Sequence, residues 1–211
     1  MADEREQLQA GLAHMSLALS EAQIDQLLAY LALLVKWNRA FNLTAVRDAN
    51  EMVAKHLLDS LSIAPLLQGK RFLDVGTGAG LPGIPLAICF PEKRFELLDS
   101  NGKKTRFLQQ AVAELALTNC VVHRSRIESC GLGADFDGVL SRAFASLADM
   151  AVACGPMLNG RGLLLAMKGQ YPEEELSRLP KPYIVKGSHA LTVPGLAGER
   201  HLIELSRGLG A

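Results

Sequence analysis

Apolar positions in the first third of the chain recur at helical spacing. Ser20 and Gln23 have the pattern of a capping box, and the apolar residues from Ile24 to Val35 that follow fall on one stripe. A second apolar stripe with helical spacing runs through residues 50–62. No segment before residue 69 alternates between apolar and polar positions as a half-buried strand does. The pattern therefore predicts a helical N-terminal lobe over residues 1–68.

The pattern changes near residue 71, where short β-type runs begin to alternate with helical segments. Helices are expected at 84–89 and 103–117 and between the later strands, and the expected strands are 71–75, 94–98, 120–123, 136–140, 162–167, 183–186 and 201–205. Alternating β and α units favour a parallel sheet with helices on both faces. The last two runs have no helical pattern between them, which is typical of an antiparallel hairpin.

These elements together predict an α/β fold. Residues 69–211 are expected to form a Rossmann-like domain with a mostly parallel seven-stranded sheet and a C-terminal antiparallel hairpin. The helical lobe would be an N-terminal extension of this domain, whether or not the two parts pack as one unit.

The glycine-rich segment 73–83 is the most informative motif, because it joins an expected strand to an expected helix. Glycine lets the backbone approach a ligand closely and adopt positive φ angles. Open α/β sheets bind ligands at the carboxyl ends of their strands, and Asp99 follows the next strand about 20 residues later. A carboxylate there can accept hydrogen bonds from both ribose hydroxyls of an adenosine group. An alternative role for Asp99 is to cap the helix that follows.

Two cofactors remain open for this arrangement. The glycines of segment 78–83 satisfy G-x-G-x-x-G, the dinucleotide pattern. Pro82 lies inside that match, where a helix should donate backbone N–H groups to a pyrophosphate. Asp74 stands two residues before Gly76, and the resulting acid-x-Gly-x-Gly-x-Gly form resembles the S-adenosylmethionine loop of Rossmann-like, class I methyltransferases. S-adenosylmethionine is therefore the favoured cofactor and a dinucleotide the alternative.

Several blocks of residues make the resemblance more specific, and the resemblance extends over about residues 31–205. The blocks are Trp37-Asn38, Asn42-Leu-Thr44, His56-Leu-Leu-Asp-Ser60, Asp74-Val-Gly-Thr-Gly-Ala-Gly-Leu-Pro-Gly-Ile-Pro85, Leu98-Asp-Ser100, Gly102-Lys103, Phe136-Asp-Gly138, Ser141-Arg-Ala-Phe-Ala-Ser146 and Gly198-Glu-Arg-His201. In this order the blocks resemble the bacterial 16S rRNA guanine-N7 methyltransferase family RsmG, also called GidB. The resemblance implies methyl transfer from S-adenosylmethionine to N7 of one guanine in 16S rRNA, conventionally numbered 527.

The resemblance also implies which residues meet the cofactor. Gly76 and Leu81 would line its methionine–ribose side, Ile127 and Glu128 would meet the adenine, and Arg142 would face the cofactor or the substrate. An alternative is that Glu128 is simply solvated. With the loop and the acidic residue after the second strand, the expected cofactor-binding residues are Gly76, Gly78, Leu81, Asp99, Ile127, Glu128 and Arg142.

Methylation at guanine N7 needs no general base, because N7 has an exposed lone pair and carries no proton. The sulfonium is already an activated donor, so the enzyme mainly has to orient the reactants and exclude water. No catalytic acid or base is therefore expected. Arg142 is a possible participant, because its planar guanidinium suits a phosphate, the methionine carboxylate or the guanine O6 edge. Its alternative role is a surface salt bridge.

The composition of the chain limits the classes of partner that we expect. The formal net charge is +0, which argues against nonspecific coating of nucleic acid but permits a local basic face. The four cysteines lack zinc-finger spacing, so no metal is expected. A charged N-terminus and the absence of an apolar run of roughly 18 residues suggest a cytoplasmic protein without a membrane segment.

The expected partner is 16S rRNA, free or in a small ribosomal subunit particle. Its candidate contacts are Arg47, Lys55, Lys103, Lys104, Arg106, Arg124, Arg126, Lys168, Arg200 and His201.

Three other functions remain open. The same fold could methylate a small molecule or a protein. An NAD-dependent oxidoreductase would need an acid such as the tyrosine of Tyr-x-x-x-Lys, but Tyr171 is followed by Pro-Glu-Glu-Glu175. A catalytically silent RNA-binding assembly factor is the third alternative.

Overall fold

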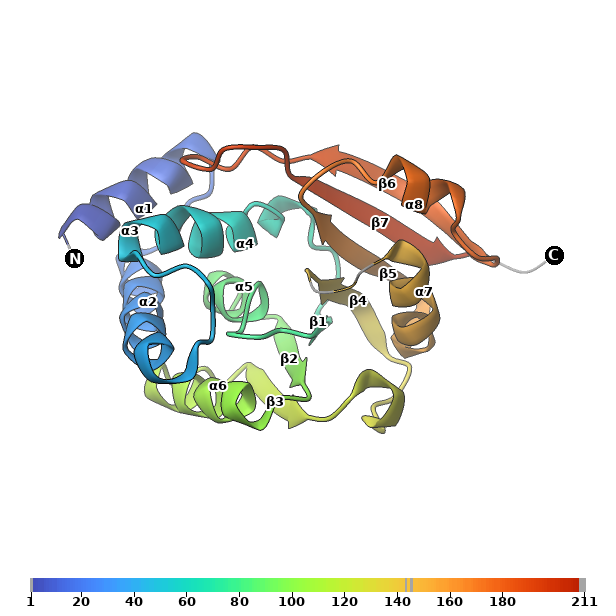
Figure 1. Ribbon diagram of the computed structural model, residues 1–211, viewed down its shortest axis with the longest axis horizontal. Helices are drawn as coiled ribbons and strands as arrows, with labels where there is room; N and C mark the ends of the chain where they lie inside the picture. The colour runs from blue at the N-terminus through green and yellow to red at the C-terminus, as the bar shows by residue number, and fades with distance from the viewer. Residues whose placement is uncertain (1, 143, 145, 209–211) are drawn as a thin grey trace.

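A single seven-stranded sheet forms the centre of the molecule (Figure 1). The computed structural model describes residues 2–142, 144 and 146–208. The strand order is β3-β2-β1-β4-β5-β7-β6. The strands are β1 Arg71–Val75, β2 Arg94–Asp99, β3 Cys120–Arg124, β4 Phe136–Ser141, β5 Leu158–Lys168, β6 Tyr183–Ala190 and β7 His201–Arg207.

The sheet is mostly parallel, as predicted. Strands β1 to β5 pair in parallel, whereas β7 runs antiparallel to both β5 and β6. Two strands differ from the expected bounds by more than two residues: β5 begins at Leu158 rather than at residue 162, and β6 continues to Ala190 rather than ending at residue 186. The α/β fold class and the C-terminal hairpin are therefore confirmed.

Helices cover both faces of the sheet. They are α1 Ala2–His14, α2 Glu21–Phe41, α3 Ala49–Met52, α4 Asp59–Leu61, α5 Gly83–Cys89, α6 Gly102–Glu114, α7 Leu147–Cys154 and α8 Glu173–Ser177. Between α3 and α4 the helix continues as a π-helical stretch, Val53–Leu58, so the helix expected at 50–62 is present but changes its hydrogen-bonding pattern in the middle. Short 3₁₀ turns occupy Ala64–Leu66, Ile127–Ser129 and Gly155–Met157.

The side-chain alternation of the strands divides the core in two. Successive strand residues point to opposite faces of a sheet. Phe72 accordingly joins an apolar cluster with the N-terminal helices and α5 and α6. The next residue, Leu73, joins a second cluster with α7 on the other face. The first cluster also contains Leu27 and Met52, so the N-terminal helices share one core with the sheet. A domain boundary at residue 69 stays a prediction.

The capping box at the start of α2 also ties the N-terminal helices to the sheet. The Ser20 hydroxyl accepts a 3.3 Å hydrogen bond from the Gln23 backbone N–H, and the Gln23 side chain accepts one from the Ser20 N–H. The amide of Gln23 then donates to the backbone carbonyls of Ile88 and Cys89 at 2.8 and 3.0 Å. One residue thus caps α2 and binds the end of α5.

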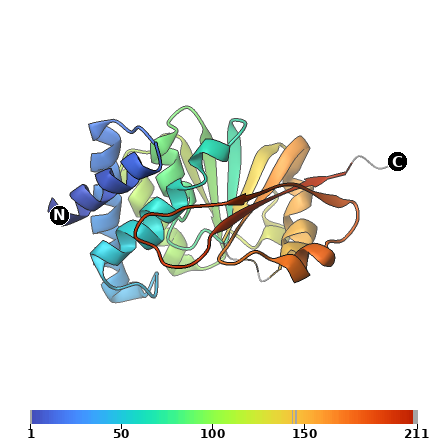
Figure 2. The same cartoon turned by 90° about the horizontal axis from the view of Figure 1, so that it is seen from above.

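The connection between β6 and β7 reaches from the far edge of the sheet to the N-terminal helices, as both views show (Figures 1 and 2). Leu191, Val193 and Leu196 of this connection pack in the first apolar cluster. The connection ends at Arg200, immediately before β7. This packing places Arg200 beside α4.

Two negative findings apply to the part of the chain that the structure describes. No helix there combines the length and hydropathy needed to cross a bilayer. No group of three or more His, Cys, Asp or Glu side chains there could hold a metal ion.

Cys89, Cys120 and Cys154 are buried, and burial raises the pKa of their thiols to about 11, 12 and 12, respectively.

Candidate functional site

The glycine loop between β1 and α5 has a backbone that side chains would disturb. Gly76, Gly78 and Gly80 have φ angles of +68°, +62° and +93°, a region that L-residues rarely adopt. A Cβ on Gly80 would also lie 2.5 Å from Cδ1 of Ile84. The alternating glycines of the sequence are therefore required by the shape of the loop.

Asp74 supports this loop through hydrogen bonds from its buried side chain. Its carboxylate is fully buried, and Oδ2 accepts hydrogen bonds from the Thr77 hydroxyl at 2.6 Å and the Gly83 N–H at 2.8 Å. Burial raises the pKa of Asp74 to about 6, although the two hydrogen bonds oppose this. Asp74, the acidic residue of the sequence motif, thus holds the loop in shape through these two hydrogen bonds.

A cavity of about 390 Å³ opens at the carboxyl ends of β1 and β2. Asp99 lies at the end of β2 and is 7 % exposed. Its Oδ2 accepts from the Gly78 N–H at 2.9 Å and its Oδ1 from the Asn101 N–H at 2.8 Å. Asn101, rather than Asp99, caps α6 by accepting from the N–H groups of the first helical turn. The capping alternative for Asp99 is therefore wrong.

The opposite wall of this first cavity comes from the chain after β3. Ile127 and Glu128 lie in a 3₁₀ turn there, the first buried and the second exposed. Val75 and Leu98 add apolar surface. The cavity therefore combines an apolar wall with a carboxylate, which suits a flat base and the hydroxyls of its sugar.

A second cavity of about 200 Å³ lies on the other side of Gly76. Its lining includes Gly78, Leu81 and Arg142, and Gly76 belongs to both cavities. The structure thus brings all seven sequence-predicted cofactor residues to two adjoining cavities. Their binding role stays a prediction.

The second cavity also contains two residues that are not among the seven predicted cofactor-binding residues. Nε2 of His56 lies 2.9 Å from the Thr44 hydroxyl, and both side chains line the cavity. Burial lowers the pKa of His56, and the positive charges of Arg142 and Lys55 act in the same direction. The imidazole is therefore neutral at pH 7.

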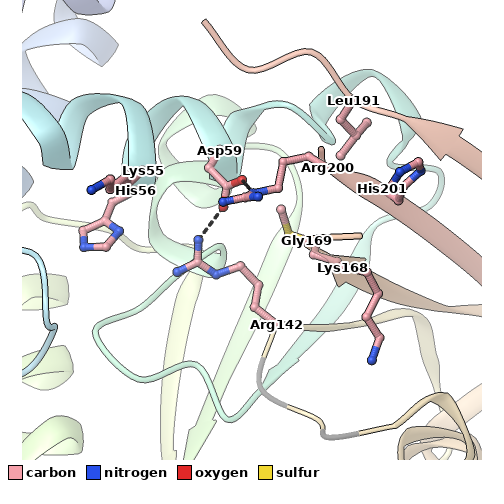
Figure 3. A pocket seen from close by; sticks show the side chains of 10 residues that line it. Lys55, His56, Asp59, Arg142, Lys168, Gly169, Leu191, Arg200 and His201 are labelled. Atoms are coloured by element: carbon pink, nitrogen blue, oxygen red, sulfur yellow. Dashed lines mark hydrogen bonds and ion pairs between the residues drawn. The ribbon is translucent and has the colours of Figure 1, made fainter. Parts of the chain in front are cut away.

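A third cavity, of about 350 Å³, adjoins the second at His56 and Arg142 (Figure 3). Here Nη1 of Arg142 donates to Oδ2 of Asp59 at 2.7 Å, and Nε of Arg200 donates to Oδ1 of the same carboxylate at 3.1 Å. The Asp59 side chain is only 7 % exposed. Arg142 thus does form a salt bridge, but its partner is a buried carboxylate at a junction of cavities rather than a surface group.

The predicted RNA contacts are only partly gathered at these cavities. Lys55, Lys168, Arg200 and His201 line the third cavity. Lys104 and Arg126 line the first. The others, Arg47, Lys103, Arg106 and Arg124, line none of the three.

Sequence reasoning missed Asp59 and Tyr30 as members of the site. Each has a signal in retrospect, because each interrupts an apolar helical stripe with a polar atom that needs a partner when buried. Asp59 meets the two arginines described above. Tyr30 donates its hydroxyl to the Ala79 carbonyl in the glycine loop at 2.6 Å.

The chain matches a known family over most of its length. The model of the GidB family, described as rRNA small subunit methyltransferase G, matches residues 23–203. A relative of that name from Saccharophagus degradans is 58 % identical over 199 residues, which cover 94 % of this chain and 89 % of the relative. The Pseudomonas aeruginosa relative of the same name is 54 % identical over 203 residues, covering 96 % of this chain and 95 % of the relative.

Solved structures with much lower identity share the fold. M. jannaschii TYW2, solved in complex with AdoMet, aligns with a TM-score of 0.56 at 16 % identity over 71 % of this chain and 74 % of that one. TrmN from Thermus thermophilus aligns with a TM-score of 0.57 at 18 % identity over 81 % of this chain and 53 % of that one. The family match and the near full-length identities above one half show that the chain belongs to the rRNA small subunit methyltransferase G (GidB) family.

Proposed function

We propose that this protein transfers the methyl group of S-adenosylmethionine to N7 of a guanine in 16S rRNA, the one conventionally numbered 527. Membership in a family named for methylation of small-subunit rRNA supports the substrate class. One observation carries the cofactor assignment: the first two cavities meet at Gly76 and bring Asp99 and the glycine loop together.

The residues present fit this cofactor. In the first cavity, Asp99 would accept the ribose hydroxyls, and Ile127 would pack against the adenine. In the second, the loop from Gly76 to Leu81 would hold the methionine part. When bound, the cofactor supplies an electrophilic methyl group on a sulfonium.

The chain's own task is to orient and to exclude water. Guanine N7 presents a lone pair and no proton, so the reaction requires no general base. Among the described side chains of the second cavity, His56 is neutral and is hydrogen-bonded to Thr44, and Arg142 is a permanent cation. Such a site favours alignment of donor and acceptor, which can lower the barrier by several kcal/mol.

The RNA would approach from the third cavity. This cavity is lined mainly by cationic and histidine side chains and meets the second cavity at Arg142. A local basic surface of this kind can bind nucleic acid even though the whole chain has a formal net charge of +0. The substrate would be 16S rRNA, either free or assembled in a small ribosomal subunit particle.

The test combines binding with mapping. The protein is titrated with S-adenosylhomocysteine, S-adenosylmethionine and NAD, and affinity for the first two only is expected. It is then given labelled S-adenosylmethionine and small ribosomal subunits from a strain that lacks the enzyme, and N7-methylguanine is mapped by borohydride and aniline cleavage. One cleavage at the expected guanine supports the proposal.

Other results would favour the alternatives. Label on a protein or a small molecule would assign another methyl acceptor, and NAD affinity would assign an oxidoreductase. Binding to the ribosomal particle without methyl transfer would favour a catalytically silent assembly factor.

A further inference from the structure

Three elements that are distant in sequence bring two arginines onto one carboxylate. Arg142 follows β4, Arg200 precedes β7, and Asp59 begins α4. Each oxygen of Asp59 accepts from one arginine, at 2.7 Å from Arg142 and 3.1 Å from Arg200. Figure 3 shows both guanidinium groups next to the carboxylate. Since the Asp59 side chain is only 7 % exposed, packing holds it in place and with it the direction of both arginines.

The lysines of the third cavity have acidic partners of their own. Nζ of Lys168 lies 2.8 Å from Oε2 of Glu175, and Nζ of Lys55 lies 2.6 Å from Oε2 of Glu51. The arginine pair shares a single carboxylate, so it retains one surplus positive charge. Among the described lysines and arginines that line this cavity, the excess charge therefore lies on the arginine pair.

Both guanidinium groups keep unused donors. A guanidinium has five N–H bonds. Arg142 uses one on Asp59, whereas Arg200 uses one on Asp59 and one on the backbone carbonyl of Glu199, 2.7 Å from its Nη1. The remaining N–H groups have no hydrogen-bond partner among the residues that the structure describes. The two side chains are 26 % and 29 % exposed, so these donors can reach a ligand in the cavity.

We propose that Asp59 holds Arg142 and Arg200 as a two-arginine clamp for one phosphodiester group of the RNA, next to the nucleotide that is methylated. The single surplus charge matches the single negative charge of a phosphodiester, and guanidinium groups bind phosphate oxygens with paired hydrogen bonds. Arg142 also lines the second cavity. A phosphate bound by the clamp is therefore adjacent to the region assigned to the methyl donor.

This inference rests on the proposed function and adds a positioning residue to it. Phosphate contacts fix register and orientation rather than sequence. Asp59 does not touch the RNA; it neutralises one of two neighbouring positive charges and sets the direction of both. A rival ligand is the carboxylate of the cofactor's methionine part. Arg200 distinguishes the two, because it lines the third cavity and not the second.

The test uses the full-length protein in three single variants. Asp59→Asn keeps the shape but removes the charge, Arg200→Gln removes one arm of the clamp, and Arg178→Gln is the matched control. Arg178 follows the last residue of α8, has a 77 % exposed side chain and is not among the residues that line the three cavities. Each variant is assayed for melting temperature, S-adenosylhomocysteine affinity, methyl transfer to unmethylated small subunits, and the salt dependence of RNA binding.

The clamp predicts a specific set of changes. Methyl transfer, as kcat/KM, falls about 10- to 100-fold in Asp59→Asn and Arg200→Gln, while S-adenosylhomocysteine affinity stays within about twofold. In Arg200→Gln the slope of log affinity against log salt becomes less steep by about one. The control resembles the unmodified protein in every assay.

Several results would overturn it. Unchanged transfer in Arg200→Gln removes the clamp, whether or not Asp59→Asn folds. Weakened S-adenosylhomocysteine binding in Arg200→Gln assigns the arginines to the cofactor. Faster transfer and tighter RNA binding in Asp59→Asn, the result of simply removing a negative charge, removes the positioning role. If the unmodified protein transfers no methyl to the particle, the proposed function fails first and the clamp fails with it.

Discussion

The hydroxyl of Tyr30 in α2 donates a 2.6 Å hydrogen bond to the backbone carbonyl of Ala79 in the glycine loop. The Tyr30 side chain is fully buried, and a buried carbonyl without a partner is costly. The N-terminal helices therefore support the proposed cofactor loop directly, in addition to sharing a hydrophobic cluster with the sheet. The partner of the Tyr30 hydroxyl could not be read from the sequence, because the two residues are 49 positions apart.

Tyr30→Phe tests this support. The substitution removes only the hydroxyl and leaves the Ala79 carbonyl buried without its donor. The free energy of unfolding is expected to fall by about 1–3 kcal/mol, and the affinity for S-adenosylhomocysteine is expected to fall several-fold because the loop is less well held. Urea denaturation and calorimetric titration measure the two effects. Tyr171→Phe is the matched control, because Tyr171 is 49 % exposed; equal effects of both substitutions would contradict the prediction.

Two alanine substitutions in the loop should separate folding from binding. Gly80→Ala places Cβ 2.5 Å from Cδ1 of Ile84 at a positive φ, and we expect a loss of about 2–4 kcal/mol of stability. Gly78→Ala meets no atom closer than 3.9 Å, so only the backbone strain remains, about 1 kcal/mol.

Gly78→Ala should affect ligand affinity more than stability. Gly78 lines the second cavity, and its N–H donates to Asp99. In Gly78→Ala the added methyl group and the strained φ angle would disturb both the cavity and this contact. The variant is therefore expected to fold but to bind S-adenosylhomocysteine about tenfold more weakly. Thermal melts and titration of both variants provide the measurement. A Gly78→Ala protein that is less stable than Gly80→Ala would show that the steric argument is wrong.

Asp99 and Glu128 line the same cavity but differ in burial. Asp99 is 7 % exposed and is fixed by two backbone N–H groups, whereas Glu128 is exposed. An oriented carboxylate can bind the ribose hydroxyls without first losing side-chain freedom. Asp99→Ala is therefore expected to reduce the affinity for S-adenosylmethionine about 10- to 100-fold, and Glu128→Ala by much less. Titration of the two variants decides, and a larger loss in Glu128→Ala would reverse the assignment.

The regular elements were predictable because their signals are local. The strand at 71–75 and the capping box at Ser20 are both present in the structure. The end of β6 was not predicted, since this edge strand is solvated on much of its surface and lacks a clear apolar alternation. The π-helical stretch 53–58 was not predicted either, because its apolar pattern is the same as that of an ordinary helix.

The candidate site was predictable only where residues act through the backbone or follow a strand. The glycines and Asp99 lie at the carboxyl ends of neighbouring strands, so topology alone brings them together. The contact of Arg142 with Asp59 spans 83 positions and depends on how the N-terminal helices pack against the sheet. Sequence periodicity has no information about such packing, which is why Asp59 was missed.

Asp74 makes the stability of the protein depend on pH in an unusual direction. Burial raises the pKa of this carboxyl from 3.8 to about 6, while the unfolded chain keeps the ordinary value. Between these pH values the folded protein binds a proton that the unfolded chain has released. The contribution of Asp74 to stability is therefore fully present below pH 3.8 and is lost as the pH rises through about 6.

Asp74→Asn should remove this dependence, because an amide is neutral at every pH. Its free energy of unfolding, relative to the unmodified protein, is expected to rise by up to about 3 kcal/mol between pH 4 and pH 7. Asp137→Asn is the control of opposite sign: although burial opposes it, hydrogen bonds from Lys70, Arg71 and Asn159 lower the pKa of Asp137. That variant should lose stability relative to the unmodified protein as the pH rises. Urea denaturation at a series of pH values measures both, and parallel curves for Asp74→Asn and the unmodified protein would show that the buried carboxyl does not titrate abnormally.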